Sequence, residues 1–159
     1  MSERGEAGIP PSSERGPSSP KVEQPPQASR ADEGTDGPSY FVLEEIEWPD
    51  ETRAPTAPRA LVEEAQRLGA RRKFLARGEG GFFSQYSEFP AGYTVPNHSH
   101  DHDELIVLLG GSCTMSDGQT LGTHDSMVLP AGFEYGFTAG DHGMVFLTIR
   151  GGRSTTTLA

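Results

Sequence analysis

Two histidines and one glutamate lie close together near the middle of the chain, in a combination that suits a transition metal. His98 and His100 are separated by one residue, and Glu104 follows four positions later. Imidazole nitrogens and a carboxylate oxygen bind Zn, Fe, Mn, Ni or Cu, and three protein ligands leave coordination positions open for water or substrate. The pattern therefore predicts a metal site at His98, His100 and Glu104.

The backbone around these residues has to bring the three side chains to one point. His98 and His100 alternate along an extended segment, so both side chains face the same side. If residues 101–103 form a tight turn, Glu104 opens the next strand, and a hairpin brings the three groups together. The alternative is a solvated polar loop. Three of the chain's five histidines lie within residues 98–102, beside a carboxylate, which favours metal binding.

Composition narrows the class of partner. The 159 residues carry a formal net charge of -10, which argues against nucleic acid and anionic membrane, because both are bound mainly through Lys and Arg. No apolar run approaches the roughly 20 residues that span a bilayer. The first residues lack the apolar segment of a secretory signal. The single cysteine, Cys113, fits a reducing compartment. We expect a cytoplasmic protein that acts on a small molecule.

The chain divides into a tail and one domain. Residues 1–39 are rich in Pro, Ser, Glu and Gly, with isolated apolar residues that cannot form a core, so we predict a disordered tail there. A tether or a partner-binding segment is the alternative for this tail. A single domain is expected over residues 40–159, which opens with a short β-prone run at residues 40–43.

A helix and many short strands are expected after that run. Pro58 can occupy the first turn of a helix over residues 58–68, in which Leu61, Ala65 and Leu68 share a face before Gly69 ends it. Short apolar segments separated by turn residues then predict an all-β sandwich or barrel. The expected strands cover residues 73–76, 82–89, 104–109, 112–115, 126–129, 133–137 and 144–149.

The histidine segment resembles the first motif of the cupin superfamily, G-x5-H-x-H-x3-4-E-x6-G. Every fixed position is filled, by Gly92, His98, His100, Glu104 and Gly111. The resemblance covers roughly residues 70 to 150. It implies a single-domain cupin, a small jelly-roll barrel that holds a metal inside, with His98, His100 and Glu104 as ligands. Iron is the first choice, and Mn, Ni, Zn or Cu are alternatives.

The second cupin motif, G-D-x4-P-x-G-x-x-H, is only partly matched. Asp125, Pro130 and Gly132 agree with it, whereas His124 stands in place of Gly and Tyr135 in place of the fourth ligand, His. Tyr135 is then a phenolate ligand, a hydrogen-bonding or acid/base group beside a three-ligand metal, or the mark of a decayed site. We favour the second interpretation, which makes Tyr135 the candidate catalytic residue.

Other residues receive simpler interpretations. His102 is an alternative fourth ligand, but its place in the expected turn favours solvent, as do the turn positions of His124 and His142. Cys113 is expected in the core. Phe133 and Phe137 share a face with Tyr135 and could line the pocket, although aromatic residues of a barrel more often belong to the plain core. Either Gln85 or Tyr86 points inward.

Several functions are compatible with the resemblance, because one fold supports many reactions. We expect a metal-dependent cupin oxygenase that acts on an organic acid or an aromatic metabolite. A cupin isomerase, lyase or cyclase is the alternative within enzymes, and a non-catalytic metal- or ligand-binding cupin is the alternative outside them. A metal-free barrel that uses a His as acid/base, as in some cupin relatives that epimerise sugars, is a third possibility, which the intact set of His98, His100 and Glu104 disfavours. Small cupins resemble homodimers, so a homodimer is also expected.

Overall fold

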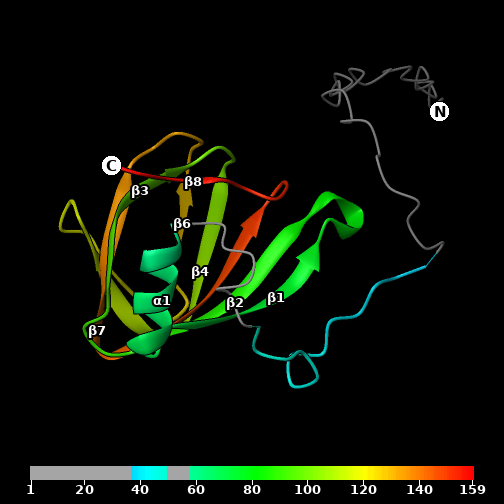
Figure 1. Ribbon diagram of the computed structural model, residues 1–159, viewed down its shortest axis with the longest axis horizontal. Helices are drawn as coiled ribbons and strands as arrows, with labels where there is room; N and C mark the ends of the chain where they lie inside the picture. Colours follow the sequence, from blue (N-terminus) through cyan, green and yellow to red (C-terminus); the bar gives the residue numbers. More distant parts are fainter. Residues whose placement is uncertain (1–36, 50–57) are drawn as a thin grey trace, which may run out of the picture. The chain divides into compact units, whose positions relative to one another are not determined.

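The computed structural model describes residues 37–49 and 58–159 (Figure 1). Most of the predicted tail, residues 1–36, lies outside the described residues. Its disorder and the bounds of the 40–159 domain therefore stay predictions. Within the two described ranges, no helix is long and apolar enough to cross a membrane.

Strands are the main regular elements of the described chain. Its elements are α1 (Arg59–Arg67), β1 (Arg71–Arg77), the short 3-10 turn η2 (Glu79–Gly81), β2 (Phe83–Phe89), β3 (Thr94–His100), β4 (Glu104–Met115), β5 (Thr120–Gly122), β6 (Ser126–Leu129), β7 (Tyr135–Arg150) and β8 (Thr156–Leu158). The strands form one sheet in the order β1-β2-β7-β3-β8, and β4 pairs with β5, β6 and β7. The predicted all-β architecture with one short helix is confirmed.

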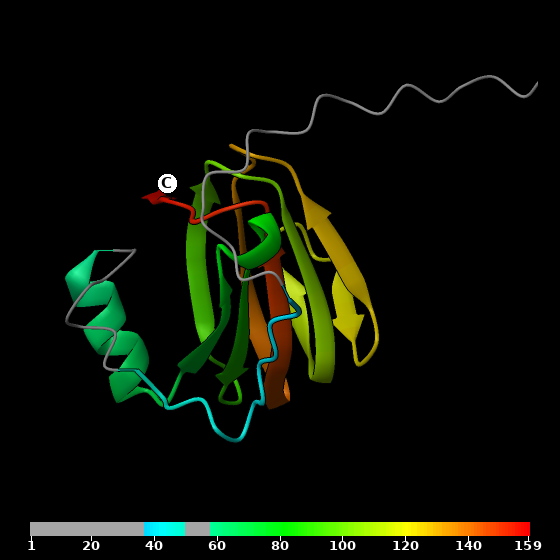
Figure 2. The same ribbon diagram turned by 90° about the vertical axis from the view of Figure 1, so that its right-hand side faces the viewer.

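The sheet curls until the two ends of its longest strand approach each other. β7 has 16 residues and would span about 50 Å if it were straight. Tyr135 at its start and Arg150 at its end nevertheless bond to the same side chain, Glu104. Figures 1 and 2 show the strands bending round an interior. The curl creates the space in which the polar residues meet.

Glycines allow this bend where the sequence predicted breaks. Gly111 has a φ of 71°, and a Cβ at this position would lie 2.0 Å from the carbonyl oxygen of Gly143 on the facing strand. The pairing of β4 with β7 also shifts register on either side of Gly110–Gly111. The strands expected at 104–109 and 112–115 are therefore one bent strand, and those at 133–137 and 144–149 are another.

An apolar core lines the inside of the curl. Its buried members include Ile106, Leu108, Met144 and Phe146, and Cys113 is buried with them, as predicted. Complete burial of a large apolar side chain contributes about 1.5–3 kcal/mol, so this cluster stabilises the bent strands.

The predicted helix is confirmed to within one residue at each end. Val62 is its buried residue, Leu61 and Ala65 are half-buried, and Leu68 is exposed. The helix ends before Leu68, and its apolar face consists of Leu61, Val62 and Ala65, with Val62 in place of the expected Leu68. α1 lies to one side of the curled sheet (Figure 2).

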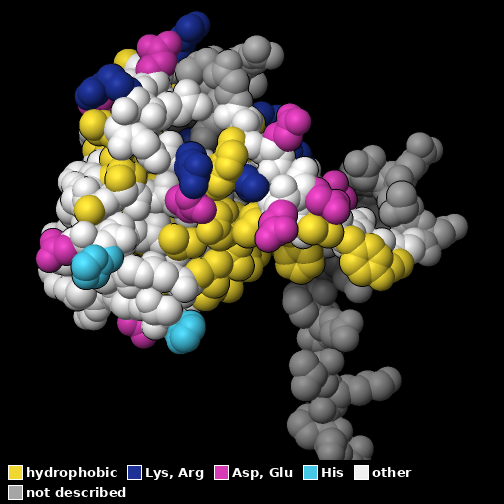
Figure 3. Space-filling view, turned by 90° about the horizontal axis from the view of Figure 1, so that it is seen from below, with side chains coloured by type: hydrophobic (Ala, Val, Ile, Leu, Met, Phe, Trp, Pro, Cys, Tyr) yellow, Lys and Arg dark blue, Asp and Glu magenta, His cyan; other side chains and the backbone are white. Residues whose placement is uncertain are grey.

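The prediction of a strand at residues 40–43 is wrong. These residues have no strand partner, and the segment turns at residues 43–45. Lys73 of β1 donates a hydrogen bond to the carbonyl of Leu43 at 2.8 Å, and Trp48 packs against Tyr86. Leu43 and Trp48 therefore contact the outer side of β1 and β2. The side chains of Tyr40, Phe41 and Val42 are exposed. Figure 3 shows one face on which apolar side chains gather.

Candidate active site

The first cupin motif does not form the hairpin that its spacing predicted. β3 pairs with β7 and β8, whereas β4 pairs with β5, β6 and β7, so residues 101–103 cross between strands that are not neighbours. Strand β7 supplies the missing link. Its first residue, Tyr135, lies opposite His98, and its last residue, Arg150, lies opposite Glu104. Directly opposed residues share a face, so all four side chains belong to the interior.

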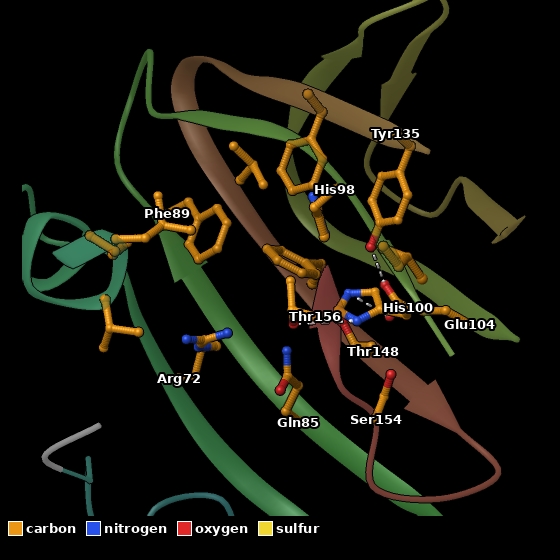
Figure 4. A pocket seen from close by; sticks show the side chains of 18 of the residues that line it. Arg72, Gln85, Phe89, His98, His100, Glu104, Tyr135, Thr148, Ser154 and Thr156 are labelled. Atoms are coloured by element: carbon orange, nitrogen blue, oxygen red, sulfur yellow. Dashed lines mark hydrogen bonds and ion pairs between the residues drawn. The ribbon is translucent and has the colours of Figure 1, made fainter. Parts of the chain in front are cut away.

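A cavity of about 110 Å³ fills the interior and has two chemically different ends. One end is apolar and is covered by α1; its lining includes Leu61, Val62, Phe74, Phe89, Phe137 and Phe146. The other end is polar and is lined by Gln85, His98, His100, Glu104 and Tyr135, while Arg72 lies on the side of Phe89 (Figure 4). Arg150, Thr148, Ser154 and Thr156 complete the polar end.

The residues that line the cavity test what the sequence predicted for two pairs, Gln85 with Tyr86 and Phe133 with Phe137. Gln85, not Tyr86, points inward, and Phe137 lines the cavity as expected. The prediction for Phe133 is wrong, since it precedes the first residue of β7 and is 54% exposed.

Glu104 is bonded on both carboxylate oxygens. The hydroxyl of Tyr135 donates to Oε1 at 2.7 Å, and Nε of Arg150 donates to Oε2. Nη2 of Arg150 also donates to Nε2 of His100 at 3.2 Å. Glu104 is 2% exposed, Tyr135 4% and Arg150 8%. Tyr135, Arg150 and His100 therefore form a nearly buried hydrogen-bond network around the carboxylate of Glu104.

The hydrogen-bond partners assign the tautomers of both histidines. Nδ1 of His98 lies 2.9 Å from the carbonyl oxygen of Pro96, which can only accept, so this nitrogen carries the proton. Arg150 can only donate, so Nε2 of His100 accepts. Both imidazoles therefore have their lone pair on Nε2. In His100 Arg150 occupies that lone pair.

Burial keeps the imidazoles neutral and the phenol protonated. Burial, reinforced by the charge of Arg150, lowers the pKa of His100 to about 4. Burial also lowers the pKa of His98, and the charge of Arg72 adds to that effect. Burial and then the charge of Glu104 raise the pKa of Tyr135 far above its ordinary value. Tyr135 is thus a neutral hydrogen-bond donor to Glu104.

These residues do not fit a metal ion as they are arranged. Within residues 37–49 and 58–159, no three His, Cys, Asp or Glu side chains converge to hold one. Nε2 of His100 and Oε2 of Glu104 lie 3.6 Å apart, a spacing that two ligands of one ion can have, since each would be about 2.1 Å from it. The guanidinium of Arg150 engages both of these atoms. The predicted metal site stays a prediction that would require Arg150 to move.

The part of the chain that resembles the second cupin motif supports the first. The amide of Gly132 donates to the carbonyl of His100 at 2.7 Å, and the amide of Ala131 donates to Asp103 at 2.8 Å. His124 has a φ of 75°, a left-handed conformation at the position where the motif has Gly. The backbone role of this segment is preserved despite the replaced residue.

Asp101 fixes the other side of the site. Its carboxylate accepts from the hydroxyl of Ser154 at 2.7 Å and from the amide of Thr155 at 2.9 Å. A hydrogen bond with His102, followed by these two bonds, holds the pKa of Asp101 well below its usual range. They tie the chain before β8 to the end of β3, which places Thr156 opposite His100.

The histidines outside the motif's ligand set do not line the cavity. His102 bonds to Asp101 at 3.0 Å and is part exposed, while His124 and His142 are exposed. The expectation that they face solvent is confirmed, although His142 belongs to β7 and not to a turn.

Two site residues were missed by reasoning from the sequence: Arg72 and Arg150. Each had a signal in strand alternation. Met144, Phe146 and Thr148 occupy the buried face of β7, and Arg150 is the next residue on that face. Arg72 likewise shares a face with Phe74 of β1, and both line the cavity. Arg150 is buried, so its charge needs a partner, and Glu104 is that partner.

Comparisons with known proteins agree with the fold. KdgF from Halomonas sp. superposes with a TM-score of 0.56 at 20% identity, over 74% of this chain and 96% of that chain. The polyketide cyclase RemF from Streptomyces resistomycificus gives 0.59 at 17% identity, over 77% and 86%. An RmlC-like cupin from Shewanella frigidimarina gives 0.55 at 18% identity, over 74% and 94%. No protein-family model and no curated protein matches the sequence.

These neighbours and the curled sheet define the architecture. The described chain has the cupin fold, the jelly roll predicted from the first motif. At these identities the likeness establishes the fold alone, so the reaction has to be argued from the site.

Proposed function

We propose that this protein is a cupin enzyme that binds a small, partly apolar organic acid in its interior and catalyses a proton transfer, as in an isomerisation, an elimination or a cyclisation. One observation carries the proposal. A buried, neutral imidazole with an unprotonated Nε2, that of His98, lines a cavity that also contains two guanidinium groups and a neutral phenol.

The charges of the cavity favour an anionic ligand. Arg72 and Arg150 both line the cavity. A guanidinium binds a carboxylate through two parallel hydrogen bonds, so a carboxylate is the ligand that we propose for this lining. The aromatic lining under α1 suits an apolar remainder, and the cavity of about 110 Å³ limits its size.

The residues support a division of roles. His98 accepts a proton from a carbon next to the carboxylate, because its Nε2 lone pair is available and its neutral form is favoured by burial. The positive charges of Arg72 and Arg150 stabilise the negative charge that then develops on the substrate. Tyr135, whose ring lies 4.4 Å from that of His98, is proposed as the hydrogen-bonding group of the site, because its hydroxyl donates to Glu104 and so orients that carboxylate.

Hydrogen–deuterium exchange tests this function before the substrate is known. Chelator-treated protein is incubated in D2O with a panel of small carboxylic acids, and NMR follows loss of signal at the carbon next to the carboxylate. We expect exchange with the wild type, and a loss of at least about a hundredfold in His98→Gln, because general bases contribute on that scale. His102→Gln, a histidine outside the cavity, is the matched control and should retain exchange.

Two other results would replace the proposal. A panel member that binds without exchange or conversion indicates a non-catalytic ligand-binding cupin. Oxygen consumption that requires added Fe²⁺ indicates the metal-dependent oxygenase predicted from the first motif. That second candidate is favoured by the 3.6 Å spacing of Nε2 of His100 and Oε2 of Glu104, and it requires Arg150 to leave these atoms.

We also propose that the enzyme is a cytoplasmic homodimer. Large apolar side chains remain exposed on β4, β6 and the chain before β7, namely Leu109, Val128 and Phe133. Exposed apolar side chains of this size are commonly covered by a second subunit. Sedimentation velocity of the wild type and of Val128→Lys tests the dimer, which the substitution should dissociate.

A further inference from the structure

Arg150 is directed into the site by the backbone. It is the last residue of β7 and is paired with Phe83 of β2 on one side and with Glu104 of β4 on the other. A residue held between two neighbouring strands cannot turn its side chain to the other face without a change of register. Its position beside Glu104 is therefore a property of the sheet, not of a mobile surface side chain.

The guanidinium of Arg150 engages the two donor atoms that a metal would need first. Its Nε donates to Oε2 of Glu104, and its Nη2 donates to Nε2 of His100 at 3.2 Å. A guanidinium is a permanent cation with N–H groups in a planar fork, so it can satisfy a carboxylate and an imidazole lone pair at once. A metal ion would have to take the same lone pairs.

The two cations cannot share the site. A divalent ion bound to these atoms would lie within a few ångströms of the guanidinium among nearly buried side chains, where like charges repel more strongly than in water. The second oxygen of Glu104 is already occupied by the Tyr135 hydroxyl at 2.7 Å. The remaining imidazole, His98, donates its Nδ1 hydrogen to Pro96 and keeps the lone pair on Nε2, so among the three predicted ligands it is the one that a metal would find unoccupied.

We propose that Arg150 is the resident cation of this site and excludes divalent metals, so that the cupin motif here serves a metal-free centre. The inference concerns the site of the proposed enzyme but does not depend on its reaction, because metal binding is measured without substrate. A site without a metal does not need a histidine at the position of the fourth ligand, which is the position that Tyr135 occupies.

Metal titration of an arginine variant tests the proposal. Metal-stripped wild type, Arg150→Gln and Glu104→Gln/Arg150→Gln are titrated with Co²⁺ by calorimetry, and bound metal is counted after dialysis. We expect no retained Co²⁺ in the wild type. In Arg150→Gln we expect one Co²⁺ bound at least about tenfold more tightly, because a repelling charge has gone and two donor atoms are freed. The double variant should lose that gain, which places the ion at Glu104.

Two controls separate the effect of Arg150 from the loss of any arginine and from unfolding of the variant. Arg153→Gln removes an exposed arginine three residues along and should behave like the wild type. Co²⁺ should raise the melting temperature of Arg150→Gln and leave that of the wild type unchanged. If Arg150→Gln does not fold, the wild-type titration still decides. One Co²⁺ retained per wild-type chain, or equal affinity in wild type and variant, overturns the proposal.

Discussion

The same three residue types form a bonded group twice in this protein, once inside the barrel and once on its outside. We call Tyr135, Glu104 and Arg150 the inner triad, and Tyr86, Glu88 and Arg71 the outer triad. In each, the tyrosine hydroxyl donates to Oε1 of the glutamate and the arginine donates to Oε2. In each, the arginine lies opposite the glutamate on a neighbouring strand.

Burial separates the two triads. The arginine and glutamate side chains are 8% and 2% exposed in the inner triad, and 54% and 30% exposed in the outer one. Water can replace a lost partner in the outer triad, so each bond there contributes little. Inside the barrel the two side chains are almost completely buried, and a charge that loses its partner there keeps little contact with solvent. The same substitution should therefore reduce the free energy of unfolding more in the inner triad than in the outer triad.

The largest effect is expected when the charge of the inner glutamate is removed. Glu104→Gln leaves Arg150 buried without a counter-charge and should lower the free energy of unfolding by about 3–5 kcal/mol. Urea denaturation followed by circular dichroism measures the change. A loss below about 1 kcal/mol, the range of exposed pairs, would mean that water reaches the inner triad.

Removal of one hydroxyl should have a smaller effect. Tyr135→Phe deletes the hydrogen bond to buried Glu104 and should cost about 2 kcal/mol, the usual contribution of a bond to a charged group. Tyr86→Phe deletes the equivalent 2.9 Å bond to Glu88 and is the matched control, with an expected cost well below that of Tyr135→Phe. Equal costs in the same denaturation assay would contradict the comparison.

Acidification should destabilise the protein through the histidine that borders the inner triad. His100 takes up a proton near pH 6.5 in the unfolded chain but only near its lowered pKa of about 4 in the folded state. Stability due to this group is therefore unaffected above pH 6.5 and declines as the pH falls from 6.5 to 4. Because the ring keeps some access to solvent, we expect about 1 kcal/mol from this group.

Melting temperatures of chelator-treated protein between pH 7.5 and 4.5 measure this decline. His100→Asn cannot take up the proton and should show a shallower fall than the wild type over the same range. His142→Asn, an exposed histidine, is the control and should follow the wild-type curve. Parallel curves for wild type and His100→Asn would rule out His100 as the cause.

The smallest effect belongs to the outer triad. Glu88→Gln removes the partner of Arg71, whose Nε lies 2.8 Å from Oε2 of Glu88, and both groups then meet water. The free energy of unfolding should fall by less than about 1 kcal/mol, and by less still in 1 M salt. A loss as large as that of Glu104→Gln would show that burial is not what distinguishes the triads.

Much of the polar end was predictable because its residues are close in sequence or belong to a known pattern. His98, His100, Glu104 and Tyr135 do line one cavity, as the spacing and the resemblance indicated. The route was different, however. A hairpin between β3 and β4 was expected, whereas each strand is joined to the other through β7. Local alternation predicts which way a side chain faces but not which strand lies beside it.

The sequence alone determined the strand-rich class, the short helix and the set of His and Glu side chains, because these depend on periodicity and spacing within a few residues. Only the tertiary structure decided what surrounds that set. Arg150 lies 46 residues from Glu104, and their bond depends on the register between β4 and β7 and on the bend at Gly111 and Gly143. The spacing of residues within a few positions does not predict that pairing. A motif that is typical of metal sites can therefore hold the guanidinium of Arg150 in place of a metal.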